Sequence, residues 1–131
     1  MTGKVRPFLM FEGRAEEAMN AYVAVIPDSE IVEVDRYGPE GAGPEGTVRR
    51  ALFRIAGQEV YCIDSSVHHA FTFTPAFSFF VECASEAELE TCFSALLAGG
   101  QALMPLDNYG FSRRFGWLND RFGVSWQFNF T

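Results

Sequence analysis

Side chains that could bind or activate a small molecule recur at every second position of three short apolar segments. They are Cys62 and Asp64 in the first segment, Ser78 and Phe80 in the second, and Ser125, Gln127 and Asn129 in the third. Residues two apart in an extended strand point to the same side of the sheet. Each set is therefore predicted to share one face of a β-strand, where a ligand could lie.

Two of these residues are candidates for catalysis. A partly buried Asp64 could act as a general base, or it could end its strand and accept hydrogen bonds from the turn at Ser65 and Ser66. Cys62 would need a neighbouring base or positive charge to become a nucleophile, and the sequence assigns neither. The alternative for Cys62 is a small buried residue. No catalytic residue is predicted.

Aromatic and basic residues near the end of the chain complete the candidate surface. Phe115 and Trp117 could form a wall for a flat ligand or pack in the core. Arg113 or Arg114 could hold an anionic ligand by a forked contact, or lie at the surface. The complete candidate ligand-binding set is Cys62, Asp64, Ser78, Phe80, Arg113, Trp117 and Gln127.

The first half of the chain predicts the order β-α-β-β-β. Apolar residues at positions 15, 18, 19, 22 and 26 follow helical spacing, and Pro27 ends that helix. Apolar or alternating segments at 5–11, 31–37, 48–55 and 59–63 predict strands. A hairpin turn is expected at 56–58.

The second half repeats this order with different residues. Ser85 and Glu88 fit a capping box before a helical stripe that reaches Leu97, and Gly99 and Gly100 stop the helix. The predicted strands are 76–83, 101–104, 114–118 and 124–130, with a loop over 105–112 and a turn over 120–123.

We therefore expect an α+β fold of two β-α-β-β-β modules within one domain, residues 1–131. The modules span 4–64 and 76–131, with a linker between them. Each helix can cover one face of its sheet only. Two such sheets set side by side can form a cupped mixed sheet, whose concave surface would take the ligand.

Composition excludes several classes of partner. Ten basic and 17 acidic residues give a net charge of −7, which disfavours nucleic acid and anionic membranes. No apolar stretch approaches the ~20 residues of a membrane helix, and the N-terminus lacks the pattern of a signal peptide. The three cysteines form no C-x-x-C motif. A cytoplasmic protein is expected.

Two further motifs, a glycine-rich segment and a pair of histidines, do not predict a binding site. Residues 41–46 read G-x-G-x-x-G, but a nucleotide-binding loop leads from a strand into a helix, and here a strand follows. No segment is typical of an S-adenosylmethionine site. His68 and His69 are adjacent on an extended linker, so their side chains point apart and are expected to be solvated rather than to share a metal ion.

Nearly the whole chain resembles a known family. The segments that carry the resemblance are PFLMFEG at 7–13, AEEAM at 15–19, IPDSEI at 26–31, FGWLND at 115–120 and FGVSWQ at 122–127. Together with the paired β-α-β-β-β order, they resemble the vicinal-oxygen-chelate superfamily of glyoxalase I, extradiol dioxygenases and bleomycin-resistance proteins. The similarity is to its PhnB-like branch, labelled 3-demethylubiquinone-9 3-methyltransferase-like.

The resemblance implies a glyoxalase-like cup and a homodimer. Metal-dependent members carry four His, Glu or Gln ligands, and the matching positions here are Pro7, Cys62, Ser78 and Gln127, to within one residue. Only Gln127 is a ligand of that type, so neither a metal nor another cofactor is expected. The expected function is binding of a small organic molecule in a metal-free cup. The alternative is a lyase, isomerase or dioxygenase-like enzyme acting on a small apolar or aromatic substrate.

Overall fold

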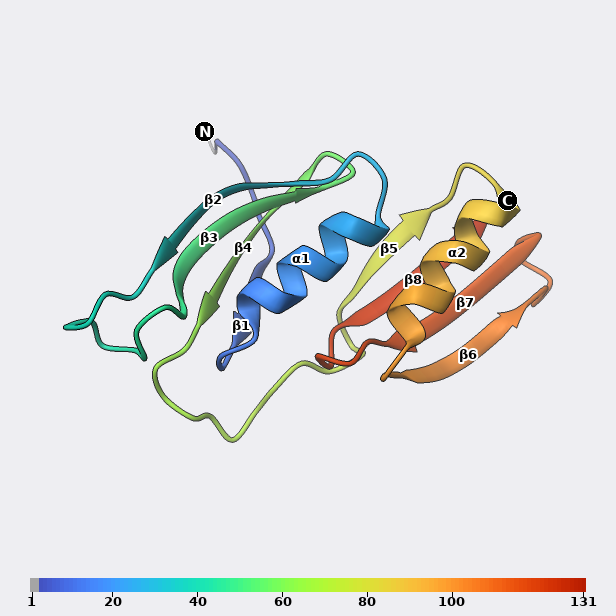
Figure 1. Ribbon diagram of the computed structural model, residues 1–131. Helices are drawn as coiled ribbons and strands as arrows, with labels where there is room; N and C mark the ends of the chain where they lie inside the picture. Colours follow the sequence, from blue (N-terminus) through green and yellow to red (C-terminus); the bar gives the residue numbers. More distant parts are fainter. Residues whose placement is uncertain (1–2) are drawn as a thin grey trace. The chain divides into compact units, whose positions relative to one another are not determined.

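A computed structural model describes residues 3–131, which form two compact units. One unit ends at Ala70 and the other begins at Phe71. Each unit contains one helix and four strands in the order β-α-β-β-β (Figure 1). The α+β class and the repeated order of elements are therefore confirmed. No helix in the described part of the chain has the length and apolar character needed to cross a membrane.

The N-terminal module has a mixed four-stranded sheet. Its elements are β1 (Phe8–Phe11), α1 (Ala15–Val25), β2 (Glu30–Arg36), β3 (Val48–Ile55) and β4 (Gln58–Asp64). The strand order is β1-β4-β3-β2, with β1 parallel to β4 and the other pairs antiparallel. The expected hairpin turn joins β3 to β4, and Ala56 and Gly57 both have positive φ there, as a tight two-residue hairpin requires.

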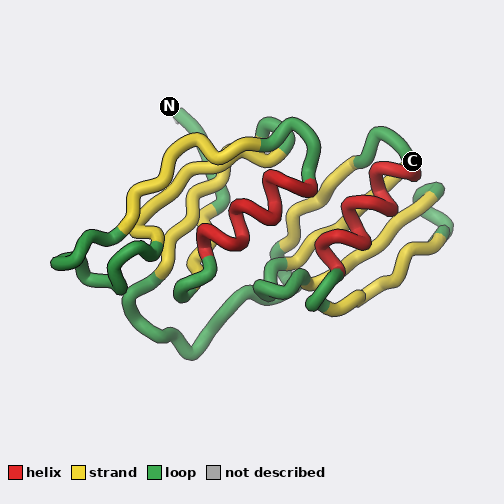
Figure 2. The backbone as a smooth tube through the Cα atoms, in the orientation of Figure 1, coloured by secondary structure: helices red, strands yellow, loops and turns green. Residues whose placement is uncertain are grey.

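The C-terminal module repeats this topology. Its elements are β5 (Ser78–Glu82), α2 (Glu86–Leu97), β6 (Gln101–Asp107), β7 (Arg114–Asn119) and β8 (Ser125–Phe130). The strand order is β5-β8-β7-β6, with β5 parallel to β8. In each module a single helix lies across one face of the sheet (Figure 2).

The apolar stripe of each helix packs on its own sheet. Four residues of α1 are fully buried, at the predicted spacing: Ala15, Ala18, Met19 and Tyr22. The Tyr22 ring lies 6.3 Å from that of Phe53 on β3. In the second module the Phe93 ring of α2 meets that of Phe128 on β8 edge to face, at 6.2 Å. These contacts identify the face of each sheet that its helix covers.

A close approach in the second module requires a glycine. A Cβ atom added at Gly116 on β7 would lie 2.5 Å from Cε2 of Phe93 and 2.6 Å from Cδ2 of Leu106. Real atoms do not approach that closely, so only glycine lets α2 and β6 pack against β7 as they do.

One strand is longer than predicted. The strand expected over 101–104 continues to Asp107, so it contains Pro105, which was expected to begin the loop. Proline removes a backbone donor and is tolerated in edge strands and at bulges. Strand β6 is an edge strand, and its register with β7 shifts on either side of Met104. Both features accommodate Pro105.

Candidate functional site

The distal face of each sheet, defined as the face turned away from its helix, carries most of the candidate ligand-binding groups. In the C-terminal sheet the strand register places on this face Ser78 and Phe80 of β5, Ser125, Gln127 and Asn129 of β8, and Phe115, Trp117 and Asn119 of β7. Trp126 and Phe128 alternate with this set and pack under α2. The predicted division of β8 into a polar face and an apolar face is present.

Gln127 is at the centre of this distal face. Its register partners are Phe80 on β5 and Trp117 on β7, so its side chain lies between two aromatic residues on neighbouring strands. Gln127 and Trp117 are half-buried, and Phe80 is 53% exposed. Within residues 3–131 the Gln127 side-chain amide has no hydrogen-bond partner. The amide is therefore available to a ligand.

A hydrogen-bonded group beside Gln127 fixes the Trp117 ring. The indole Nε1 of Trp117 donates to Oγ of Ser125 at 2.8 Å, and the Ser125 hydroxyl lies 2.7 Å from that of Ser78. Ser125 is almost completely buried, whereas Ser78 is half-buried. This arrangement holds the tryptophan in one orientation and leaves Ser78 as the accessible hydroxyl of the group.

An aromatic cluster extends the surface beyond Phe80. The Phe115 ring is buried and lies 6.3, 6.1 and 5.0 Å from the rings of Phe80, Tyr109 and Phe111. The last three side chains are all exposed, Phe111 to 62%. Sequence reasoning missed Tyr109 and Phe111 because they fall in a loop, where no periodicity indicates which way a side chain points.

The structure places Arg113 away from this group. Its guanidinium lies 5.6 Å from the centre of the Phe130 ring, at the end of β8, and no described contact joins it to Trp117 or Gln127. The adjacent Arg114 pairs with Glu90 of α2 at 3.3 Å. Arg113 therefore lies at the margin of the candidate site.

Cys62 lies on the helix-covered face of the N-terminal sheet, and this differs from its expected position in a ligand cup. Its side chain is fully buried, together with those of Val60 and Asp64, which share its face of β4. Burial, and secondarily the charge of Asp64, raise the pKa of the Cys62 thiol to about 12. A protonated, inaccessible thiol is neither a nucleophile nor a metal ligand at neutral pH.

Asp64 also lies on the helix-covered face, where it joins three segments. Its Oδ1 accepts hydrogen bonds from the backbone amides of Gly13 at 2.8 Å and Ala15 at 3.0 Å, and its Oδ2 accepts from the amide of Val48 at 2.9 Å. Two of these amides belong to the start of α1 and the third begins β3. The expected turn at Ser65 is not the partner. This geometry uses the carboxylate to hold the backbone rather than to move a proton.

The distal face of the N-terminal sheet carries the residues next to those predicted. Tyr61 on β4 pairs in register with Phe8 on β1 and Leu52 on β3, so these three share the distal face, and Ile63 follows by alternation. The prediction assigned Cys62 and Asp64 to the ligand-binding face, whereas Tyr61 and Ile63, each one residue earlier, lie on the distal face. In a strand, a shift of one residue moves every side chain to the other face.

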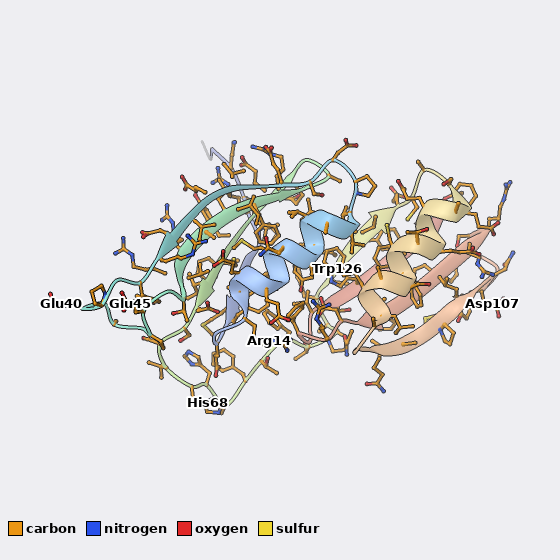
Figure 3. The ribbon with its side chains drawn as sticks, viewed as in Figure 1. Arg14, Glu40, Glu45, His68, Asp107 and Trp126 are labelled. Atoms are coloured by element: carbon orange, nitrogen blue, oxygen red, sulfur yellow. The ribbon has the colours of Figure 1, made fainter. Side chains whose placement is uncertain are left out.

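The glycine-rich segment at 41–46 and the histidine pair at 68 and 69 have structural roles. Residues 41–46 belong to the loop between β2 and β3, where Glu40 and Glu45 project (Figure 3). A Cβ at Gly43 would lie 2.6 Å from the Tyr37 ring, so this glycine serves loop packing. His68 Nδ1 lies 2.8 Å from Oε1 of Glu12, and Oε2 of the same carboxylate accepts from the His69 amide at 3.2 Å. These contacts tie the linker to the end of β1.

A second buried carboxylate was not singled out from the sequence. Asp120, in the β7–β8 turn, accepts hydrogen bonds from the amides of Phe122 and Val124, at 2.9 and 3.0 Å, and from the Trp126 indole at 2.9 Å. An aspartate two residues before a donor amide in a turn is the signal that could have identified it.

The donor set does not fit the metal centre that the fold implies. Of the four matching positions, Pro7 has no side-chain atom that can bind a metal, and Cys62 is buried under α1. The Ser78 hydroxyl is hydrogen-bonded to that of Ser125. Within residues 3–131, no three His, Cys, Asp or Glu side chains lie close enough together to hold an ion. Divalent metals in proteins need three or more good ligands.

Comparison with known proteins agrees with this architecture. A PhnB protein from Bacillus cereus is 54% identical, with 98% of this chain and 100% of that chain covered and a TM-score of 0.96. Protein PA1353 from Pseudomonas aeruginosa is 28% identical, with 98% of each chain covered and a TM-score of 0.82. No curated protein matches the chain.

A more distant structure shows the wider fold. A glyoxylase/bleomycin resistance protein/dioxygenase domain from Frankia is 16% identical, with 99% of this chain and 92% of that chain covered and a TM-score of 0.62. The chain thus has the glyoxalase-like fold. The family model described as 3-demethylubiquinone-9 3-methyltransferase matches residues 3–129, and this chain therefore belongs to that family.

Proposed function

We propose that this protein binds a small organic molecule with a flat apolar part on the distal face of its C-terminal sheet, without a bound metal. The observation that carries the proposal is the free Gln127 amide between Phe80 and Trp117. A half-buried amide with no internal partner gains a hydrogen bond when a ligand supplies one.

The neighbouring groups complement the amide. The accessible faces of Phe80 and Trp117 can stack on a flat ligand, and aromatic contacts of this kind contribute about 0.5–1.5 kcal/mol beyond burial alone. The Ser78 hydroxyl adds a donor or acceptor at one end, and Arg113 adds a cation at the margin. An apolar surface with a few placed polar groups is typical of small-molecule sites.

Binding is supported better than catalysis. An enzyme acting on the same class of molecule would need an acid, a base or a nucleophile beside the ligand. The two candidates for those roles, Cys62 and Asp64, belong to the helix-covered face of the other module. The family description names a methyltransferase, but the G-x-G-x-x-G segment at 41–46 joins two strands, β2 and β3, whereas a nucleotide-binding loop leads from a strand into a helix.

We also propose a homodimer. Several large apolar side chains are more than half exposed, which disfavours an isolated subunit in water. They are Phe8, Phe71, Phe77, Phe80 and Phe111. The cytoplasmic location expected from the sequence stays a prediction.

Native mass spectrometry of protein purified without chelators or metal-affinity tags tests these points together. We expect two subunits, no stoichiometric metal and a retained organic compound. The affinity for that compound, measured by calorimetry, should fall at least tenfold in Gln127→Ala and less in Ser78→Ala. Gln58→Ala, at the exposed first residue of β4, is the control. Equal affinities in all variants, or a metal at one per subunit, would contradict the proposal.

A further inference from the structure

We propose that the distal face of the N-terminal sheet holds a second binding site, for a small organic carboxylate, made by Arg50, Arg6 and Tyr61. The site concerns the N-terminal module alone and does not depend on the function proposed above. It would select a negatively charged, flat molecule over a neutral one of the same shape.

The site begins with two cations on one ring. The guanidinium carbons of Arg6 and Arg50 lie 5.1 and 5.0 Å from the centre of the Tyr61 ring. Cations are attracted to an aromatic face at this distance. The ring itself is half-buried between Phe8 and Leu52 of the adjacent strands. Tyr61 therefore brings two like charges to within about 10 Å of each other, and an anion bound beside them would offset their repulsion.

Arg50, like Arg113 of the other module, has a charge that no acid in the described residues matches. Most arginines in the described part of the chain form an ion pair with a carboxylate: Arg6, Arg14, Arg36, Arg49, Arg54 and Arg114. Arg50 has no carboxylate within ion-pair distance among residues 3–131. The acid opposite it across the β2–β3 ladder, Asp35, is bound by Arg49 at 2.5 Å. The exposed Arg50 fork is thus free to bind an anion.

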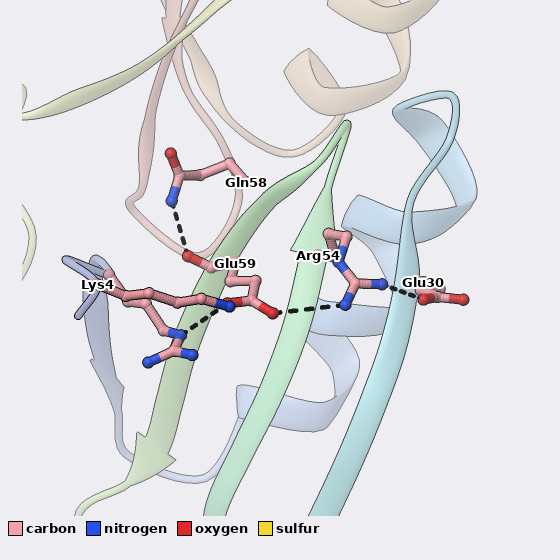
Figure 4. Close-up of polar contacts among 6 residues, drawn as sticks. Lys4, Glu30, Arg54, Gln58 and Glu59 are labelled. Carbon is pink, nitrogen blue, oxygen red and sulfur yellow. Dashed lines mark hydrogen bonds and ion pairs between the residues drawn. The ribbon is translucent and has the colours of Figure 1, made fainter.

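The surroundings of Arg6 are also positively charged. Glu59 accepts from Lys4 Nζ at 3.1 Å and Arg6 Nε at 2.9 Å, and it pairs with Arg54 at 3.4 Å (Figure 4). Hydrogen bonds from Lys4 and then Arg6 lower the pKa of Glu59, so this carboxylate stays charged and its oxygens are already occupied by cationic donors. An open depression of about 430 Å³ is lined by Lys4, Arg6, Arg54 and Glu59; it adjoins the proposed site at Arg6 and is not lined by Arg50 or Tyr61. Arg54 also pairs with Glu30.

The charges around the site favour an anion despite the acidity of the chain. Four cations, Lys4, Arg6, Arg50 and Arg54, lie with three carboxylates, Glu30, Glu33 and Glu59, in a protein of net charge −7, while Asp35 is paired with Arg49. Glu33, opposite Leu52, is the acid that bounds the site on the β2 side. Because a carboxylate matches the guanidinium fork, a ligand can pair with Arg50 through two parallel hydrogen bonds. Its flat part would then lie against Tyr61 and Phe8.

Nuclear magnetic resonance of the arginine Nε–Hε groups tests the site directly. The probe is sodium benzoate, with benzamide as the uncharged molecule of the same shape. We expect benzoate to shift the Arg50 and Arg6 signals saturably, with a Kd on the order of 1 mM or tighter. Benzamide should leave them unchanged.

Variants separate this site from general attraction. Arg50→Gln should weaken benzoate binding by about tenfold or more, because hydrogen bonds to charged groups are lost. Arg14→Gln removes the same charge from an exposed, ion-paired arginine at the start of α1, leaves the Arg49–Asp35 pair intact, and should change the affinity less than twofold. Arg50→Lys keeps the charge and loses the forked guanidinium, so its affinity for benzoate should lie between those of the other two variants.

Two results would overturn the proposal. One is equal weakening by Arg50→Gln and Arg14→Gln, which would indicate nonspecific charge attraction. The other is equal binding of benzoate and benzamide, which would indicate an aromatic surface with no anion site. Neither result bears on Gln127, so the C-terminal site stands or fails separately.

Discussion

In the N-terminal module the first turn of α1 is held by a carboxylate from β4, whereas in the C-terminal module the first turn of α2 is held by residues beside the helix. Asp64 accepts the amides of Gly13 and Ala15 across 51 and 49 residues. Ser85 Oγ accepts the Glu88 amide at 3.0 Å, and Glu88 accepts the Ala84 amide at 2.7 Å. One helix therefore depends on tertiary structure and the other carries its own cap.

The distal faces of the two modules differ in a parallel way. That of the N-terminal sheet combines Tyr61 with arginines, and that of the C-terminal sheet combines Gln127 with aromatic rings. The helix-covered faces of both sheets are mainly apolar and buried, with Asp64 as the charged exception. The same strand topology thus fixes the core and leaves the distal faces free to carry different chemistry.

The largest effect should come from removing the carboxylate that ties α1 to its sheet. Asp64→Ala leaves three backbone amides without their acceptor, and each buried unsatisfied group costs about 1–3 kcal/mol. We expect a loss of about 4 kcal/mol in the free energy of unfolding, measured in urea. Amide hydrogen exchange should show the loss in the N-terminal module. Asp35→Ala, an exposed acid, is the control, and equal stability of both variants would refute the role given to Asp64.

A smaller loss should follow from filling the contact at Gly116. Gly116→Ala places a methyl group against Phe93 and Leu106, and overpacking of this kind costs about 1–3 kcal/mol. Thermal unfolding followed by circular dichroism measures it. Gly38→Ala, where a Cβ meets nothing within 4 Å, should leave the midpoint nearly unchanged. A Gly116→Ala protein as stable as Gly38→Ala would show that α2 packs more loosely than described.

The helix caps sharpen the contrast between modules further. Ser85→Ala removes the side-chain acceptor at the start of α2 and should cost about 1 kcal/mol. Arg14 occupies the equivalent position of α1 and makes no side-chain cap hydrogen bond. Arg14→Ala should therefore change the unfolding midpoint less than Ser85→Ala does. The reverse order would mean that α1 is capped by its own residues.

The smallest effect at neutral pH concerns Cys62. Because its folded pKa is raised from 9.0 to about 12, its contribution to stability is complete below pH 9 and declines as the pH rises toward 12. Native Cys62 should therefore resist alkylation by iodoacetamide at pH 8, as mass spectrometry of tryptic peptides would show. Cys62→Ala should have a flatter stability profile above pH 9. Rapid labelling of native Cys62 at pH 8 would show that the thiol is accessible.

The element order and both helical stripes could be predicted because their signals are local and periodic. The face of β4 could not, since both alternate sets of this strand, Val60 with Cys62 and Tyr61 with Ile63, are apolar. Because Asp64 is polar, its side of the strand, which includes Cys62, was predicted to face a ligand. Asp64 is instead buried because it satisfies three backbone amides from distant segments, and such long-range partners leave no mark in local spacing.

On β8 the candidate residues could be placed correctly because their alternation is unambiguous. Ser125, Gln127 and Asn129 are polar, and the residues between them are large and apolar. The neighbours of Gln127 required the strand order as well, because β5 and β8 are adjacent but 47 residues apart in register. Sequence periodicity assigns a face, whereas only topology brings Phe80 and Trp117 together around one amide.

The pairing of the first and last strands within each module has a consequence for synthesis on the ribosome. Strand β1 pairs with β4, so β1 has no partner in the N-terminal sheet until the residues up to Asp64 have been made. The sheet is then complete and needs no residue of the second module. Units of this kind fold in order as the chain emerges. The Asp64 carboxylate thus becomes available to α1 at the moment the sheet can close, while the second module is still being made.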